Sequence, residues 1–169
     1  MSLMLASGNF FAYLSTYFIA VLPFIEAKGA IPIGMSLGLS PVSAFFCSYV
    51  GSLTPVPFLL TLTIPALEYL EKNKKLIRLS RKIRKYIHKK TSKVTTQDNQ
   101  LIASSLKKPI KLFALFFLVA IPIPGTGVWS GSLVASAFKL NVKHAFFVIA
   151  IGNFFASSVI FLATFGFFV

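Results

Sequence analysis

The chain has 169 residues, of which 56% are hydrophobic and only 12% are charged, whereas a soluble domain carries about 25% charged residues. Its length allows one domain with a handful of membrane passes, because each spanning helix takes about 20 residues. The net charge of +13 is concentrated in the middle of the chain, which indicates the cytoplasmic side of an inner or cytoplasmic membrane and argues against nucleic-acid binding.

The first apolar segment, residues 10–25, is short for a full membrane span. No Lys or Arg precedes it, so we expect it to be retained rather than cleaved as a secretory signal. It runs into Glu26–Gly34, the first broken segment, where Gly29, Pro32 and Gly34 predict an interrupted helix. The pattern predicts a short arm that ends in a tip.

A full membrane span follows. A brief apolar return leads to residues 38–41, an uncharged turn that contains Gly, Ser and Pro. Residues 42–67 are then apolar and long enough to cross a membrane. The two prolines within residues 54–57 predict a kink or an unwound turn in this span.

The polar middle, residues 68–111, holds most of the basic side chains. Its densest part, Lys72–Lys93, contains no acid. Apolar residues recur there at helical spacing, at Leu76, Leu79, Ile83, Tyr86 and Ile87. We predict a basic amphipathic helix on the membrane surface, with residues 72–111 cytoplasmic and in contact with anionic lipid. A solvated helix that packs on nothing is the alternative.

The second half begins with another short apolar arm, residues 112–120. It ends in Ile121–Gly131, the second broken segment, which is rich in Pro and Gly. A brief apolar return leads to a turn marked by basic residues at 139–144, and residues 145–168 form a long span.

The two halves therefore share one order of events and several short matches. The matches are Ala30–Ile33 with Ala120–Ile123, Ala44–Phe46 with Ala145–Phe147, and Gly51 with Gly152. We predict a single all-α membrane domain over residues 1–169, with one repeat in residues 10–67 and a second in residues 112–168, as in transporters built from internal repeats.

Topology follows from the lengths and the charges. A short arm, a broken tip and a short return form a re-entrant helical hairpin, so each half crosses once and the second repeat is inverted. With the basic middle inside, the uncharged turn at 38–41 and both termini are external, whereas Lys139 and Lys143 are internal, as the positive-inside rule requires. An ordinary bundle in which each arm spans fully is the alternative.

Two re-entrant tips that enter from opposite faces would meet near the membrane midplane, where transporters bind substrate. Glu26 is the only acid in the apolar part of the chain and Lys28 is its nearest base. Because burial favours the protonated form of a carboxylic acid, Glu26 is a candidate proton carrier. Lys28 is a candidate for binding an anionic headgroup. The alternative is an internal ion pair that holds the tip shut.

The second broken segment is a candidate anion site. Gly125, Thr126 and Gly127 precede a half-helix expected to start near Val128, and free backbone N–H groups gather at such a start. A tight turn that needs small residues is the alternative. Trp129 would pack on a substrate or anchor the hairpin.

Signals for enzyme chemistry are missing from the sequence. Asp98 is the sole Asp, and His88 and His144 match no zinc spacing. We expect no catalytic residues, no metal and no cofactor.

The two broken segments, E-A-K-G-A-I-P and I-P-I-P-G-T-G-V-W-S-G, resemble the small multidrug export protein family over nearly the whole chain. That family has Arg where this chain has Lys28, so charge is kept while bidentate phosphate binding is lost. The family is distantly similar to the DedA superfamily, whose members have two re-entrant hairpins and are linked to moving lipids, including polyprenyl phosphates. The resemblance implies roles for Glu26, Lys28 and Gly125–Gly127.

These observations predict a small, proton-coupled membrane transporter that exports amphipathic small molecules or translocates a lipid. One alternative is a polyprenyl-phosphate or phospholipid translocase; another is a non-transporting membrane organiser that binds anionic lipid through Lys72–Lys93. A homodimer would enclose a path for substrate. The expected site residues are Glu26, Lys28, Gly29, Pro32, Pro122, Pro124, Gly125, Thr126, Gly127, Trp129 and Asn153, the last of which would bond a broken tip or a neighbouring helix.

Overall fold

The computed structural model describes residues 2–72, 108–123 and 125–168. Within these ranges the chain is helical and contains no strand, so the predicted all-α fold class is confirmed there. The predicted amphipathic helix, nearly all of the basic block and Pro124 lie outside the described residues.

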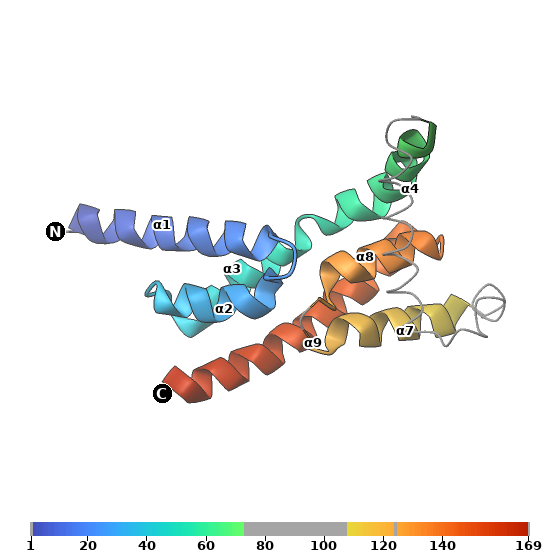
Figure 1. Cartoon of the computed structure of the whole chain (residues 1–169). Helices are drawn as coiled ribbons and strands as arrows, with labels where there is room; N and C mark the ends of the chain where they lie inside the picture. The colour runs from blue at the N-terminus through green and yellow to red at the C-terminus, as the bar shows by residue number, and fades with distance from the viewer. Residues whose placement is uncertain (1, 73–107, 124, 169) are drawn as a thin grey trace.

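The first half begins with a helical hairpin. α1 (Ser2–Val21) and α2 (Glu26–Ser36) run in opposite directions and pack on each other (Figure 1). Residues 22–25, here called the first tip, join them. The apolar arm predicted to begin at residue 10 therefore starts earlier and ends earlier than expected.

The predicted break at Gly29, Pro32 and Gly34 is wrong. All three residues lie inside the continuous helix α2, although Pro32 cannot donate a backbone hydrogen bond. α2 is packed against α1, α3 and α9, and this burial on several sides outweighs the low helix propensity of Gly and Pro.

The first span consists of α3 (Pro41–Leu53) and α4 (Val56–Lys72), with a break at the predicted place. Ser40 caps α3, because its Oγ accepts a hydrogen bond from Ser43 N at 3.3 Å, and Pro41 occupies the first helical turn. The predicted uncharged turn before α3 is confirmed.

The second half repeats this order with α7 (Lys108–Ala120), α8 (Val128–Ala137) and α9 (Val142–Phe168). Residues 121–127 are here called the second tip. Residues 121–123 and 125–127 are non-helical, and α8 begins at the predicted residue. The basic turn is shorter than expected: α9 starts at Val142, where the Asn141 side chain accepts from Lys143 N at 3.0 Å.

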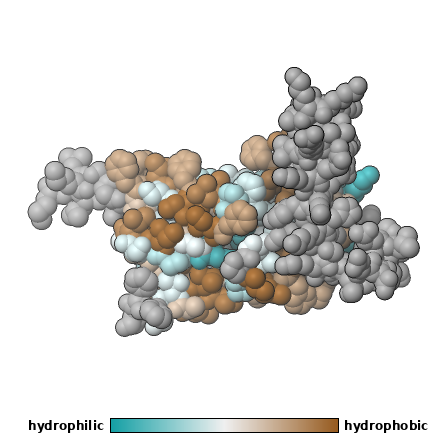
Figure 2. All heavy atoms as spheres, in the orientation of Figure 1, coloured by the Kyte–Doolittle hydropathy of each residue, from teal (hydrophilic) through white to brown (hydrophobic). Residues whose placement is uncertain are grey.

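Two segments are long and apolar enough to cross a membrane, Pro41–Thr63 and Val142–Gly166. Only 33% of the best window in each is buried inside the protein, and large apolar side chains such as Phe46, Phe58 and Phe147 face outward. Figure 2 shows many apolar side chains on the part of the visible face that is not grey. Such a surface suits lipid rather than water.

Part of the internal similarity is also visible in the packing. Ala44 and Ala145 each donate a backbone hydrogen bond of 2.9 Å at the start of a span. A Cβ on Gly51 would lie 2.7 Å from the carbonyl oxygen of Tyr17 in α1, and one on Gly152 would lie 3.1 Å from that of Phe116 in α7. Each glycine thus lets its span approach the first arm of its own hairpin.

The match between Ala30–Ile33 and Ala120–Ile123 is wrong as a structural equivalence. The first segment lies within α2, whereas the second covers the end of α7 and the start of the second tip. The two stretches are similar in sequence but differ in local structure.

The hairpins position the site. The α1–α2 hairpin extends from the end of the molecule that carries both termini, the α7–α8 hairpin extends from the opposite end, and their tips meet between the two ends (Figure 1). Each return arm packs on the other half, α2 on α9 and α8 on α4.

Candidate functional site

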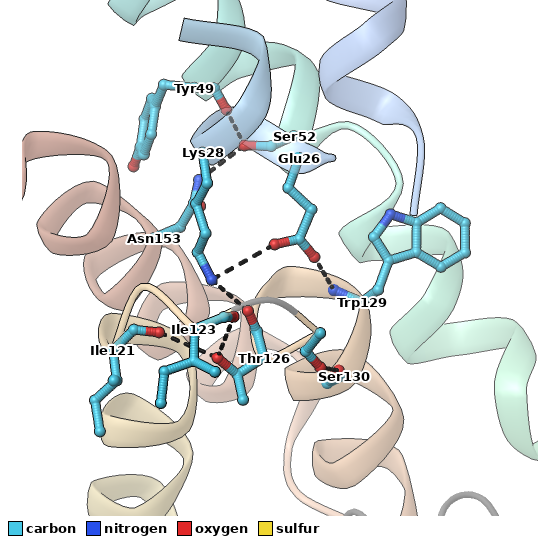
Figure 3. A network of polar contacts seen from close by, with 11 residues as sticks. Glu26, Lys28, Tyr49, Ser52, Ile121, Ile123, Thr126, Trp129, Ser130 and Asn153 are labelled. Carbon is cyan, nitrogen blue, oxygen red and sulfur yellow. Dashed lines mark hydrogen bonds and ion pairs between the residues drawn. The ribbon is translucent and has the colours of Figure 1, made fainter. Parts of the chain in front are cut away.

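Glu26 opens α2 directly after the first tip and is only 5% exposed. Its φ is 51°, and Phe24 within the tip has a φ of 75°. A left-handed backbone is uncommon in residues other than glycine and costs about 1–3 kcal/mol at each position. This strained turn directs the Glu26 side chain toward the second tip (Figure 3).

The Glu26 carboxylate lies at the N-terminus of α8. Its Oε1 accepts a hydrogen bond from the backbone N of Trp129 at 3.2 Å. A Cβ built on Gly127 would lie 1.9 Å from Oε2, so only glycine permits this approach. A negative charge is stabilised at a helix N-terminus. The chain's own carboxylate therefore lies at the helix N-terminus where an anion site was expected, and binding of a separate anion there stays a prediction.

Lys28 also reaches the second tip, from the first turn of α2. Its Nζ lies 3.8 Å from Glu26 Oε2 and donates a hydrogen bond to the carbonyl oxygen of Thr126. Because the Lys28 side chain is only 12% exposed, the ion pair is largely shielded from solvent. Through these contacts the Glu26–Lys28 pair joins the start of α2 to the second tip and α8, which lie far from it in the sequence (Figure 3).

Side chains of the second tip and of the first turn of α8 donate hydrogen bonds to the backbone of the tip. Thr126 Oγ1 donates to the carbonyl oxygens of Ile121 at 3.1 Å and Ile123 at 2.9 Å. Ser130 Oγ donates to the carbonyl oxygen of Gly125 at 2.6 Å. Irregular backbone persists inside a membrane only when such bonds replace the helical ones.

Trp129 ties the second hairpin to the first. Its indole Nε1 donates to the carbonyl oxygen of Val21 at the end of α1, at 3.2 Å. The ring also forms one wall of an open pocket of about 170 Å³ beside the tips. The pocket is lined by Pro23, Phe24, Glu26, Gly125, Trp129, Ser130 and Leu133.

Other expected site residues lie apart from this contact. Gly29 packs on Ile25, where a Cβ would meet Cγ2 at 2.7 Å, and Pro32 lies further along α2. Pro122 belongs to the second tip but has no contact with Glu26 among those described. Asn153 Nδ2 donates to Ser52 Oγ at 2.8 Å. Of the two partners expected for Asn153, it therefore bonds the neighbouring helix and not a tip.

Sequence reasoning missed Ser52, Ser130 and the aromatic ring of Phe24. A signal existed for Ser52, because it follows Gly51 just as Asn153 follows Gly152. Extending the repeat by one residue would have paired the two side chains. No comparable pattern marks Phe24 or Ser130.

A family model described as "Putative small multi-drug export protein" matches residues 26–159, which begin at Glu26 and include the second tip. No curated protein and no solved structure matches the chain.

Proposed function

Since the chain belongs to the small multi-drug export protein family, we propose that it is a membrane transporter that exports amphipathic small molecules in exchange for protons carried by Glu26. The family is one of export proteins and not of enzymes, and the two apolar segments suit a membrane location.

One observation carries this proposal: the only acid in the apolar part of the chain closes on the opposite hairpin. Glu26 contacts Gly127 and the backbone N of Trp129, and Lys28 bonds Thr126. Charged groups within a membrane protein are costly, so their presence at a contact between the two hairpins suggests a role in transport.

Protonation of Glu26 is the proposed trigger. A neutral carboxyl group loses its charge attraction to the α8 N-terminus and to Lys28. The contact between α2 and the second tip then weakens, and the two hairpins can separate. Loss of the proton on the other side of the membrane restores the closed contact. Such a cycle links one proton to each opening.

The pocket beside the tips suits an amphipathic substrate. Phe24, Trp129 and Leu133 offer apolar and aromatic contacts, and Glu26 offers a negative charge. An organic cation with an aromatic body matches this combination, because aromatic faces and a carboxylate both attract cations. The proton and the cation would then compete for Glu26.

The membrane arrangement is part of the proposal. Hairpins α1–α2 and α7–α8 enter from opposite faces of an inner or cytoplasmic membrane without crossing it, and the repeats are inverted. Single cysteines at Ser40 and Lys139, in a Cys47→Ser background, test the opposite orientation of the two halves with an impermeant thiol reagent on intact cells. We expect labelling at Ser40 alone. Labelling at Lys139 alone would mean that the protein has the reverse orientation in the membrane. Equal labelling at both positions would exclude the proposed arrangement.

Transport itself is tested with purified protein in lipid vesicles that contain ethidium and carry a proton gradient. We expect Glu26→Gln to reduce gradient-driven ethidium movement at least tenfold. Lys143→Gln, an exposed residue in the first turn of α9, is the matched charge control and should be unaffected. Full proton-driven movement in the Glu26→Gln variant would contradict the proposal.

A second candidate is translocation of a lipid phosphate, as the likeness to the DedA superfamily suggests. The nearness of Lys28 to the α8 N-terminus favours it. Movement of a fluorescent phosphatidylglycerol in the same vesicles distinguishes the two candidates, because this substrate would require Lys28.

The organiser alternative depends on Lys72–Lys93 and predicts the opposite result. Neutralising that block would then abolish function, while Glu26→Gln would not. A homodimer remains part of the proposal, and cross-linking in vesicles would test it.

A further inference from the structure

Four polar side chains are fully buried where α2, α3 and α9 pack together. Ser48 and Ser52 come from α3, and Asn153 and Ser157 come from α9; each is 0% exposed. Three of their polar atoms, Ser48 Oγ, Asn153 Oδ1 and Ser157 Oγ, have no hydrogen-bond partner among the described residues. Buried polar atoms in folded proteins nearly always bond to protein or to water.

The four side chains form a row. Ser52 and Asn153 are joined at 2.8 Å, and each of the other two lies one helical turn away on the same helix face. Because α3 and α9 run in opposite directions (Figure 1), Ser48 and Ser157 extend from the pair toward the same end. That end carries both chain termini.

The Ser52–Asn153 pair continues into further polar residues of the row in one direction only. In the other direction, four residues after Ser52 and four before Asn153, lie Val56 at the start of α4 and Ile149 on α9, which are also 0% exposed. Both belong to an apolar cluster with Val119 and Val128. The interior toward the opposite end of the molecule therefore offers no unpartnered buried side-chain atom among the described residues. Its buried hydroxyls, Ser132 and Ser136, donate to backbone carbonyl oxygens.

We propose that Ser48, Ser52, Asn153 and Ser157 line a water-filled path that connects the Glu26–Lys28 pair with the end of the molecule that carries both termini. Figure 3 draws the Ser52–Asn153 bond in the same close view as the Glu26–Lys28 pair, and α2, which carries that pair, packs on both α3 and α9. Ordered waters bond the three unpartnered atoms and exchange protons with Glu26. This inference rests on the proposed proton coupling, and it names the side from which protons arrive.

The path is tested by the reactivity of buried cysteines. In a Cys47→Ser background, Ser48→Cys and Ser157→Cys are compared with Val56→Cys and Ile149→Cys, which are equally buried. The protein is reconstituted in one orientation, and silver ions, which pass through narrow aqueous paths, are added on the side of the termini. We expect Ser48→Cys and Ser157→Cys to react at least tenfold faster than the two controls.

Equal rates at all four positions, or faster reaction at Val56→Cys and Ile149→Cys, would overturn the path. Reactivity is measured without transport, so it remains informative even if Glu26→Gln leaves ethidium movement intact. Should a cysteine variant fail to fold, Ser48→Ala and Ser157→Ala provide a second test. A hydrated path predicts at least threefold slower proton uptake with unchanged ethidium binding, and unchanged proton uptake would contradict it.

Discussion

The carboxylate of Glu26 lies directly against the α-carbon of Gly127, at the point where one hairpin meets the N-terminus of the other's return helix. The contact leaves no room for a side chain at Gly127. The acid of one half of the chain thus depends on a glycine of the other half, which makes this contact the most sensitive point of the proposed mechanism.

Gly127→Ala should separate Glu26 from α8. The added Cβ would lie 1.9 Å from Oε2, so the carboxylate must move and lose its bond to Trp129 N. We expect a loss of stability of about 1–3 kcal/mol, together with loss of gradient-driven transport. Gly166→Ala, where a Cβ meets nothing within 4 Å, is the matched control. Wild-type transport by Gly127→Ala would show that the contact is dispensable.

The second tip was predictable because its signals are dense and local. Prolines and glycines crowd residues 121–127, and the helix resumes where they end. The first tip was misplaced, because Gly29, Pro32 and Gly34 seemed a stronger break than the single Pro23 in residues 22–25. Packing of α2 on three other helices decides the outcome, and no local pattern reports such packing.

The two central residues of the candidate site were predictable, but their arrangement was not. The rarity of an acid in an apolar chain singled out Glu26, and the spacing of glycines singled out Gly127. Their direct contact depends on the left-handed backbone of Glu26. Nothing in the sequence signals that conformation, because Glu is not a residue that favours it.

Trp129→Phe should separate the anchoring role of the indole from its role as a pocket wall. The change removes the Nε1 bond to the carbonyl oxygen of Val21 but keeps an aromatic ring. We expect a loss of about 1 kcal/mol in unfolding free energy with ethidium affinity nearly unchanged. Trp129→Ala should also weaken ethidium binding. Equal affinities for all three proteins would exclude the ring from the binding site.

Gly51→Ala and Gly152→Ala should test the equivalence of the two halves. A Cβ would meet backbone oxygen at 2.7 Å on Gly51 and at 3.1 Å on Gly152, and backbone cannot move aside cheaply. We expect each change to cost about 1–3 kcal/mol, with Gly51→Ala the more damaging, as measured by unfolding in mixed micelles. If either variant were as stable as Gly166→Ala, close packing at that glycine would be refuted.

The bond between Ser52 and Asn153 should couple the two spans energetically. Asn153 donates to Ser52 Oγ at 2.8 Å, and Ser52 donates onward to the carbonyl oxygen of Tyr49 at 2.9 Å. Hydrogen bonds between membrane helices contribute about 0.6 kcal/mol on average and up to about 1.7 kcal/mol. A double-mutant cycle with Ser52→Ala and Asn153→Ala, measured by unfolding in mixed micelles, should yield a coupling energy in that range. As a control, Ser158→Ala replaces Asn153→Ala in the cycle, because the Ser158 hydroxyl donates within α9. This control cycle should yield no coupling energy. A coupling energy of zero between Ser52 and Asn153 would mean that their bond does not hold the two spans together. The polar row would then have no hydrogen bond that joins α3 to α9.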